Sequence, residues 1–393
     1  MRIVAFPYHD WRKGDQEGMR WRDGHLLEVL GDHPAVESLL VVDRPVSLAE
    51  RLIRRTPGRA RGPIVARHRS GRSEATLTKV RERTAVLDIG VPDLLRPVRT
   101  PRAWWFEVFA RRSVLDHVAW AADLAAGEHP AVIAWTPTVW PAIERLRPGA
   151  FVYDSLDNWI LHPQLRRQAP LAEAAYRAML PTASAVVASA PRSRDVLARW
   201  HQPVEIIPNG VTPGQFERTP VRPLDLPAGP IVGYAGSMGP RLDTALIADV
   251  ARMMPNVRFV FLGQALDRAT VRILTSSPNV VVLGDRHYDR LPDYMGCFDV
   301  AWIPHAVGQS ESGGDPIKMY EYWAAGREVV ATPIDGLDRL ADRLHLVRTA
   351  DDAVAAIAGL LDGTRSPKHA TVPPERTWGA IANRLVVLLG GTP

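Results

Sequence analysis

Residues 315–332 read DPIKMYEYWAAGREVVAT. The first part of this stretch, Pro316–Ala324, has the apolar spacing of a helix, and the last part, Glu328–Ala331, is a short apolar strand pattern. A helix that leads into a short apolar strand is the repeating step of a parallel α/β sheet. The stretch therefore predicts a doubly wound domain around itself.

The same alternation continues on both sides of this stretch, through the C-terminal half of the chain. The expected strands are Ile231–Ala235, Arg258–Leu262, Val280–Leu283, Val300–Ile303 and Leu344–Val347. The expected helices are Asp243–Met254, Asp351–Leu361 and a last one at Arg376–Leu389. Ligands of such sheets bind at the carboxyl ends of the strands, so we look for the functional residues there.

The N-terminal half carries a second series of the same kind. Its expected strands are Arg2–Phe6, Ser38–Val42, Ala85–Ile89, Ala131–Trp135, Phe151–Tyr153, Ala185–Ala188 and Val204–Ile207. Its expected helices include Trp21–Leu30, Trp104–Ala126 and Leu171–Leu180. A proline-rich stretch that begins at Pro213 is typical of a linker. The sequence predicts two doubly wound α/β domains, 1–212 and 213–374, followed by a C-terminal helix in 375–393.

Length and composition agree with two globular domains. The chain has 393 residues, of which 46% are hydrophobic and 23% charged. No apolar run is long enough for a membrane-spanning helix, and the first strand begins at Arg2, which leaves no room for a signal peptide. Cys297 is the single cysteine, so an internal disulfide and a cysteine-built zinc site are excluded. We expect a cytoplasmic protein.

The net charge of +5 is concentrated in one segment, 51–83, which holds eleven Lys or Arg and two Glu. Its Arg, Gly, Pro and Ser content predicts a long loop or a loop–helix insertion. Two interpretations remain: a solvated face without a partner, or contact with an anionic acceptor or the anionic inner face of a membrane. No nucleic-acid-binding module is present, so no nucleic acid partner is expected. The aromatic run Trp104–Phe109 could rest at lipid headgroups, but a core helix is the favoured interpretation.

Several standard motifs are absent. The turn Gly233–Gly239, GYAGSMG, lacks the dinucleotide spacing, and no acidic residue ends the next strand, which argues against NAD. There is no phosphate loop ending in Gly-Lys-Ser/Thr, no paired-histidine metal motif and no Gly-x-Ser-x-Gly elbow. The glycine-rich turn, including Gly236 and Ser237, can still donate backbone N–H groups to a diphosphate.

The opening stretch itself suits an anionic ligand. Gly313 and Gly314 precede the helix and let a ligand approach the backbone, and the helix N-terminus offers N–H donors. Lys318, in the first turn, adds a positive charge, and Glu321 lies three residues on, on the same face. The alternative is an exposed Lys–Glu pair that stabilises the helix by only about 0.2–0.5 kcal/mol.

Four stretches, in this order along the chain, resemble the retaining glycosyltransferases of family four, which have the GT-B fold. The resemblance implies two Rossmann-like domains that face a cleft, with the helix in 375–393 returning to the N-terminal domain. Arg22-Asp-Gly-His25-Leu resembles an Arg-Pro-x-His-Leu helix, and Phe151–Trp159 resembles the Tyr-Asp-x-x-Asp segment of a branch that acts in cell-surface polysaccharide assembly. Pro208-Asn-Gly-Val211 resembles a Pro-Asn-Gly-Val-Asp motif, with Thr212 in place of the Asp. Residues 315–332 resemble the donor-site segment.

The resemblance implies roles for the C-terminal residues. Lys318 and Arg241 would stabilise the departing diphosphate, with Asp154 of the N-terminal domain as a catalytic carboxylate. The donor-binding residues would be Gly236, Ser237, Glu311, Gly313, Gly314, Asp315, Lys318, Met319 and Glu321, and Glu321 would accept the ribose hydroxyls. Gly313 stands where the family has the carboxylate that holds the donor sugar, so Glu311, Asp315 or the backbone alone would replace it. The family's sugar-contacting His has no assigned counterpart, because the corresponding strand end reads Trp135-Thr-Pro137.

The acceptor side is expected in the N-terminal domain. The loop after the first strand offers His9, Asp10 and Trp11, residue types that suit sugar contacts. Arg22, His25 and Asp157 are further candidates. Each has a structural alternative, since Asp154 and Asp157 would also suit helix capping and Arg22 and His25 would also pack against the loop.

The resemblance implies transfer of a hexosyl unit from a nucleoside-diphosphate sugar, of the UDP, GDP or dTDP type, to an acceptor hydroxyl with retention of configuration. The acceptor would be a saccharide, a lipid-linked molecule or a small molecule. No metal and no further cofactor are expected. Two alternatives stay open: a sugar-nucleotide epimerase of the same fold, and a protein that binds nucleotide sugars without turnover.

Overall fold

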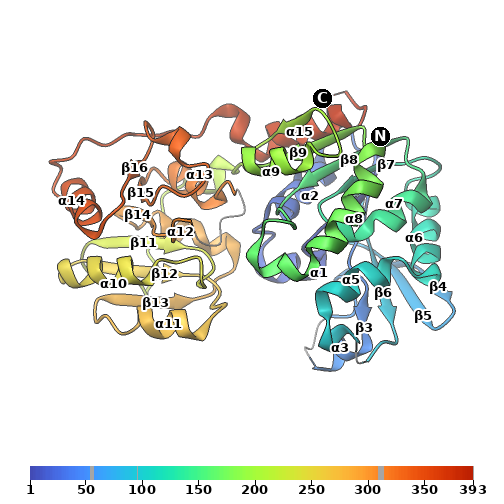
Figure 1. Ribbon diagram of the computed structural model, residues 1–393, viewed down its shortest axis with the longest axis horizontal. Helices are drawn as coiled ribbons and strands as arrows, with labels where there is room; N and C mark the ends of the chain where they lie inside the picture. Colours follow the sequence, from blue (N-terminus) through green and yellow to red (C-terminus); the bar gives the residue numbers. More distant parts are fainter. Residues whose placement is uncertain (54–56, 95, 309–313, 393) are drawn as a thin grey trace. The chain divides into compact units, whose positions relative to one another are not determined.

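Figure 1 shows the computed structural model, which describes residues 1–53, 57–94, 96–308 and 314–392. The chain divides into two compact units. The N-terminal unit comprises Met1–Pro208 together with Trp378–Pro393, and the C-terminal unit comprises Asn209–Thr377. The sequence placed these boundaries at 212/213 and 374/375, a few residues away.

The N-terminal unit is built on a ten-stranded sheet, counted over the described residues. Its strands are β1 (Arg2–Phe6), β2 (Ser38–Val42), β3 (Val46–Ser47), β4 (Ile64–Ser70), β5 (Ser73–Lys79), β6 (Thr84–Val91), β7 (Ala131–Ala134), β8 (Ala150–Ser155), β9 (Ala185–Ala188) and β10 (Val204–Ile206). The order is β10-β9-β8-β7-β1-β2-β6-β5-β4, and β3 pairs with the end of β6. Because β1 is followed by β2 on one side and by β7 on the other, the sheet has its topological switch point between β1 and β7.

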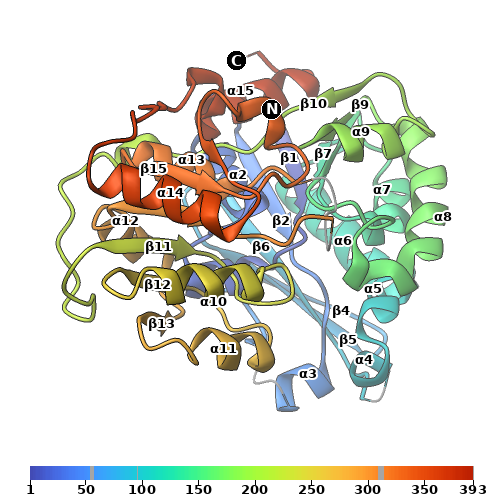
Figure 2. The ribbon, with the colours of Figure 1, turned by 60° about the vertical axis from the view of Figure 1, so that its left-hand side comes forward.

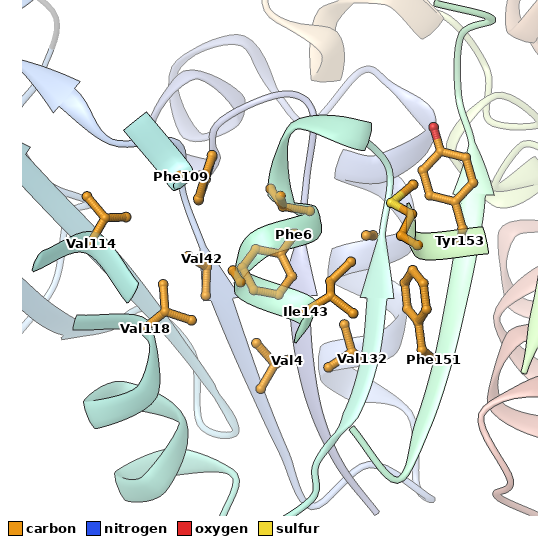
Figure 3. Close-up of a cluster of buried hydrophobic side chains, with 14 of the residues drawn as sticks. Val4, Phe6, Val42, Phe109, Val114, Val118, Val132, Ile143, Phe151 and Tyr153 are labelled. Atoms are coloured by element: carbon orange, nitrogen blue, oxygen red, sulfur yellow. The ribbon is translucent and has the colours of Figure 1, made fainter. Parts of the chain in front are cut away.

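Helices cover both faces of this sheet. They are α1 (Trp11–Glu17), α2 (Arg22–Asp32), α3 (Leu48–Ile53), α4 (Arg96–Arg99), α5 (Pro101–Phe109), α6 (Arg112–Ala125), α7 (Trp140–Leu146), α8 (Ala169–Met179), α9 (Pro191–Leu197) and α15 (Trp378–Leu388). Figure 3 shows part of the core, in which side chains of β1, β2, β7 and β8 face those of α5, α6 and α7. The C-terminal helix α15 packs against α2, where the rings of His25 and Trp378 stack 4.9 Å apart.

The prediction of a long loop or loop–helix insertion at 51–83 is wrong, because most of this segment forms an antiparallel hairpin. Strand β4 pairs with β5, and β5 pairs with β6, so the hairpin extends the sheet to its edge. Along β5, Ala75 and Leu77 point into the core, while β4 turns Arg67 and Arg69 to solvent. Charged side chains of this kind protect an edge strand from pairing with other chains.

Two further expectations change in detail. The helix expected over Trp104–Ala126 is two helices, α5 and α6, separated at Ala110 and Arg111. Trp104 and Phe109 are fully buried, which confirms the core interpretation of this aromatic run. The loop expected after β1 contains the short helix α1.

The C-terminal unit is built on a six-stranded parallel sheet, again counted over the described residues. Its strands are β11 (Ile231–Ala235), β12 (Arg258–Leu262), β13 (Val280–Gly284), β14 (Val300–Ile303), β15 (Glu328–Ala331) and β16 (His345–Leu346). Its helices are α10 (Thr244–Met253), α11 (Arg268–Leu274), α12 (Leu291–Met295), α13 (Ile317–Ala324) and α14 (Ala350–Leu361). Short 3-10 turns complete both units at Pro137–Val139, Pro163–Gln168, Leu180–Thr182, Pro213–Gln215, Tyr288–Arg290, Asp338–Leu340 and Pro374–Arg376.

The strand order of this second sheet, β13-β12-β11-β14-β15-β16, reverses between β11 and β14. A switch point leaves a crevice at the carboxyl ends of the two strands, because the chain leaves them in opposite directions. Helix α13 belongs to one face of the sheet, and α10, α11 and α14 to the other. The two units therefore share one kind of architecture, as the sequence predicted. None of the helices in the described ranges is both long and apolar enough to cross a membrane.

Candidate functional site

The glycine turn after β11 lies directly beneath a lysine ammonium. Gly236 donates its N–H to the carbonyl of Leu262 at 2.8 Å, which fixes the turn against the end of β12. A Cβ added at Gly236 would stand 2.5 Å from Lys318 Nζ and 2.9 Å from Tyr234 Oη. Glycine is therefore the residue that lets the ammonium approach the backbone here.

Lys318 is held in place by an aromatic side chain from β11. It donates from Nζ to Tyr234 Oη at 3.2 Å and lies 4.6 Å from the centre of that ring, a cation–π distance. The Tyr234 hydroxyl in turn donates to the carbonyl of Ser237 at 3.2 Å. Lys318 stands in the first turn of α13, where Pro316 at the N-cap makes no side-chain capping bond. The helix therefore presents N–H groups and a positive dipole end beside the ammonium.

Arg241 and His305 lie near Lys318 in the crevice. Backbone pairing joins Leu242 to His305, and Ala306 donates its N–H to the carbonyl of Arg241 at 2.9 Å. Burial, together with the charges of Lys318 and Arg241, holds the pKa of His305 well below its usual range. At neutral pH the imidazole is uncharged, so the positive charge of the crevice comes from Lys318 and the exposed Arg241. This combination suits a multiply charged anion.

One turn further along α13, Glu321 is almost fully buried. Tyr288 donates its hydroxyl to Glu321 Oε1 at 2.7 Å. Burial raises the pKa of Glu321 to about 7, although Tyr288 and Lys318 both oppose the rise. The carboxyl is therefore poised between its neutral and ionised forms near neutral pH, which is unusual for a surface pair and typical of a functional position.

Two other residues that the sequence predicted for the donor site, Asp315 and Met319, are buried inside the C-terminal unit. Asp315 is fully buried: Oδ2 accepts from the Asn209 N–H at 2.7 Å, and Oδ1 accepts from Tyr320 and Arg339 at 3.0 and 3.1 Å. It anchors the Asn209–Gly210 loop to α13, so its carboxylate is not available to a donor sugar. Met319 lies in the hydrophobic core, which contradicts a donor contact.

The remaining predicted donor residues include two that the structure describes and two that it does not. Ser237 and Gly314 are exposed. Glu311 and Gly313 lie outside the described residues. Sequence reasoning missed Tyr234, His305 and Tyr288, although the first two stand at or just after strand ends, where functional side chains are expected.

The switch point of the N-terminal sheet is organised by a buried carboxylate, Asp23 of α2. Asp23 accepts the backbone N–H groups of Tyr8 and His9 at 2.9 and 2.7 Å, and its Oδ1 lies 2.9 Å from His9 Nδ1. Burial alone would raise the pKa of Asp23, but the contacts with His9 lower it below its usual value. The His9 ring also stacks on Trp21, 4.2 Å away. Asp23 thus fixes the orientation of the His9 ring through Nδ1.

The neighbours of His9 have structural roles. Trp11 is buried, with 4% of its surface exposed, which contradicts a direct acceptor contact. Asp10 accepts from the Arg44 N–H at 3.1 Å and lies 3.3 Å from the buried Arg12 guanidinium. Asp10 therefore joins the start of α1 to the end of β2.

Asp154, predicted as catalytic, is fully buried in an ion pair. Arg22 Nε lies 3.1 and 2.9 Å from its two oxygens, and Trp135 Nε1 donates to Oδ2 at 2.8 Å. Arg22 also donates to the carbonyl of Pro208 at 3.0 Å, at the last residue of the unit. The Asp154 carboxylate is therefore not free to bind an acceptor hydroxyl, which contradicts its predicted role. Its hydrogen bond to Trp135 also explains why a tryptophan follows the end of β7.

His25 and Asp157 do not join this group. His25 is buried against Trp378, and burial lowers its pKa to about 3, so the ring stays neutral. Packing, the structural alternative, therefore describes His25. Asp157 is partly exposed, and its carbonyl accepts from Ser155 at 3.3 Å.

Comparison with known proteins agrees with this geometry. The family model "Glycosyl transferases group 1" matches residues 229–363, which hold the whole cationic crevice. Over 150 residues the chain is 26% identical to TuaH of Bacillus subtilis (strain 168), a glycosyltransferase assigned to teichuronic acid biosynthesis. This alignment spans 37% of the present chain and 38% of TuaH.

Solved structures resemble the whole chain. An α,α-trehalose-phosphate synthase (UDP-forming) from Burkholderia xenovorans, in complex with glucose-6-phosphate, aligns with a TM-score of 0.68 at 10% identity and covers 100% of both chains. AviGT4, a glycosyltransferase involved in avilamycin A biosynthesis, aligns with a TM-score of 0.54 at 14% identity, over 99% of this chain and 97% of its own. At these identities the likeness concerns the fold. Residues 229–363 thus form a glycosyl transferases group 1 domain, within a chain that has the GT-B fold.

Proposed function

We propose that this chain is a glycosyltransferase that moves a hexosyl unit from a nucleoside-diphosphate sugar to an acceptor hydroxyl, with retention of configuration. One observation carries the proposal: Lys318 lies over the Gly236 turn at the switch point of a glycosyl transferases group 1 domain. The ammonium, Arg241 and the N-terminus of α13 supply positive charge where a diphosphate would lie.

In the reaction, the bond from the anomeric carbon to the diphosphate oxygen breaks, the acceptor oxygen bonds to that carbon, and the acceptor proton is released. Negative charge grows on the departing diphosphate. Lys318 stabilises this charge from a fixed position, because Tyr234 already orients it before the donor binds. Glu321, in its ionised form, accepts the ribose hydroxyls.

The acceptor hydroxyl is assigned to the N-terminal unit. His9, held by Asp23 through Nδ1 and stacked on Trp21, offers Nε2 for a hydrogen bond with the acceptor at the carboxyl end of β1. A saccharide, a lipid-linked molecule and a small molecule all carry the hydroxyl that this nitrogen would orient. In the proposed reaction, no metal and no further cofactor takes part.

A direct test is the release of nucleoside diphosphate from UDP-, GDP- and dTDP-hexoses, measured with and without a panel of acceptors. The panel contains a free hexose, a hexose phosphate and a lipid-linked saccharide. We expect release from one donor class that depends on an acceptor, together with a glycosylated product. Conversion of the donor sugar without any acceptor would instead indicate an epimerase. Nucleotide binding without any conversion would indicate a binding protein.

A further inference from the structure

The turn after β13 brings Tyr288 against the buried carboxyl group of Glu321. This turn, Tyr288–Arg290, leads directly into α12, and Figure 2 labels α12 and α13 beside the strands of the C-terminal sheet. Tyr288 and Glu321 are 3% and 4% exposed. The Tyr288 hydroxyl donates to Glu321 Oε1 at 2.7 Å, a length typical of a hydrogen bond to an ionised carboxylate. The contact therefore joins the loop at the carboxyl end of β13 to the helix that carries Lys318.

The packing around Tyr288 fixes the direction of its hydroxyl. Its ring meets the ring of Phe216 edge to face, with the ring centres 6.2 Å apart. Phe216 is buried and follows the turn Pro213–Gln215, which contacts α13. A ring that is held in this way has its hydroxyl in place before a ligand arrives.

The hydrogen bond also determines what Glu321 can offer to a ligand. The last side-chain torsion of a glutamate has a broad distribution, so a carboxyl group without a partner samples many orientations. Tyr288 occupies Oε1, whereas none of the described residues donates a hydrogen bond to Oε2. The carboxyl group is therefore held at one oxygen, and the second oxygen has a constant direction and keeps its lone pairs for a ligand.

The ionisable groups around Glu321 come from three elements. Lys318 and Tyr322 lie on its own helix, and Tyr288 lies on the turn after β13. Glu328 of β15, which also contacts α13, is bound to a histidine ring and to two backbone N–H groups. Burial raises the pKa of Glu321 to about 7, while the Tyr288 hydroxyl and the Lys318 charge act in the opposite direction. Tyr288 therefore favours the ionised carboxylate.

We propose that Tyr288 is the positioning residue of Glu321, whose second oxygen it aims at the ribose hydroxyls of the donor. The Tyr288 hydroxyl donates its proton to Oε1, so Tyr288 acts through Glu321 and not by a contact of its own with the donor. It fixes the orientation of the carboxyl group, and it favours the charged form that accepts hydrogen bonds. The inference rests on the proposed function in one respect, the contact between Glu321 and the ribose.

Titration of the Glu321 carboxyl group in the free protein tests the contact without any nucleotide. In protein labelled with ¹³C at the glutamate carboxyl carbon, the NMR signal of Glu321 is the one that Glu321→Gln removes. Tyr288→Phe keeps the ring and removes only the hydroxyl, so it should raise the titration midpoint of this signal by about one pH unit. Tyr294→Phe is the matched control and should leave the midpoint unchanged, because Tyr294 is a buried tyrosine of the same unit whose hydroxyl donates to Asp225.

Nucleotide affinity measured between pH 6 and pH 9 tests the link to the ribose. With UDP, GDP or dTDP, whichever binds the wild type, Tyr288→Phe should weaken binding about fivefold at pH 7, because a rise of about one unit removes that share of the ionised carboxylate. The difference between the two proteins should shrink toward pH 9, where the carboxyl group is ionised in both. In a Glu321→Gln background, Tyr288→Phe should change the affinity by less than about twofold, because a residue that acts through Glu321 then has no carboxylate to position.

Two results would overturn the inference. One is a carboxyl midpoint that Tyr288→Phe leaves unchanged. The other is an equal loss of affinity from Tyr288→Phe in the wild-type and Glu321→Gln backgrounds, since Tyr288 would then act independently of the carboxylate. A shifted midpoint without a matching change in nucleotide affinity would overturn the link to the ribose. A wild type that binds none of the three nucleotides would contradict the proposed function, and the carboxyl titration would still decide whether Tyr288 positions Glu321.

Discussion

The two switch points of this molecule share one kind of topology but differ in how their charged side chains are paired. Between β11 and β14, the crevice presents Lys318, Arg241 and a helix N-terminus, with Glu321 kept near its titration point by burial. Between β1 and β7, the organising groups are the buried carboxylates Asp23 and Asp154.

Both carboxylates bind groups of the protein itself. Asp23 holds His9 and the turn before it, and Asp154 holds Arg22 and Trp135. The comparison indicates that the strand order determines where a site forms, whereas the charge of the side chains determines which ligand the site can bind. We propose that the first crevice holds a diphosphate and that the second holds the acceptor hydroxyl.

The largest expected effect concerns the N-terminal ion pair. Arg22→Ala leaves the Asp154 carboxylate buried with one partner fewer, which should lower the free energy of unfolding by about 3–5 kcal/mol. Arg384→Ala is the matched control, because its pair with Glu205 is half exposed and should contribute about 1 kcal/mol or less. Urea unfolding of both variants measures the two values. Similar, small losses would mean that Asp154 is not a structural anchor.

The next largest effect comes from a variant that displaces Lys318 in the cationic crevice without removing its charge. Gly236→Ala places a methyl group 2.5 Å from Lys318 Nζ at a position with a φ of +156°, so the lysine must move away and the turn is strained as well. Losing one charge-assisted hydrogen bond should weaken nucleotide binding by about tenfold to a hundredfold. Gly363→Ala, at a position of the same unit with a φ of +76° and open space around it, is the control for backbone strain. Isothermal titration with the preferred nucleotide measures the affinity of both variants. An unchanged affinity in Gly236→Ala would mean that Lys318 does not contact the nucleotide.

A smaller effect follows from the titration of Glu321. Because its pKa is about 7, the carboxyl of the free protein is increasingly protonated below that pH. If the ionised form binds the ribose, the proton must leave on binding, so affinity should fall by about tenfold between pH 8 and pH 6. Glu321→Gln should remove this slope and keep only the titration of the nucleotide itself. A wild-type profile parallel to that of Glu321→Gln would contradict a ribose contact.

The smallest effect sharpens the division between the two switch points. His9→Gln changes only the N-terminal crevice, so nucleotide affinity should stay within about twofold of the wild type. Transfer to the acceptor should fall, because the nitrogen that orients the hydroxyl is lost. Nucleotide affinity and acceptor-dependent turnover, measured on the same preparation, distinguish a role of His9 on the donor side from a role on the acceptor side. A large loss of nucleotide binding would place His9 in the donor site.

Much of the fold could be predicted from the sequence, because Val- and Ile-rich strands alternate with amphipathic helices. The β4–β5 hairpin could not, since the side chains that β4 turns inward are Ala66, His68 and Ser70, which carry no apolar alternation. Lys318 and Glu321 stand out because one helix carries both.

Carboxylates were harder to interpret. Asp154 was predicted as catalytic and Asp315 as donor-binding, but their partners Arg22 and Asn209 lie 132 and 106 positions away. Sequence alone shows neither partner, so a buried anchor and a reactive carboxylate look the same. Tyr234 and His305 were missed for a similar reason, because their roles depend on contacts that only the folded sheet brings together.

The central claim is that Lys318 marks a nucleoside-diphosphate site, and thermal unfolding with UDP, GDP, dTDP and ADP tests it most directly. A nucleotide at 100 times its dissociation constant should stabilise the wild type by about 2.7 kcal/mol. We predict this shift with one nucleotide for the wild type and for Lys79→Ala, an exposed lysine of β5, and its loss in Lys318→Ala. Equal shifts in wild type and Lys318→Ala, or no shift with any nucleotide, would contradict the claim.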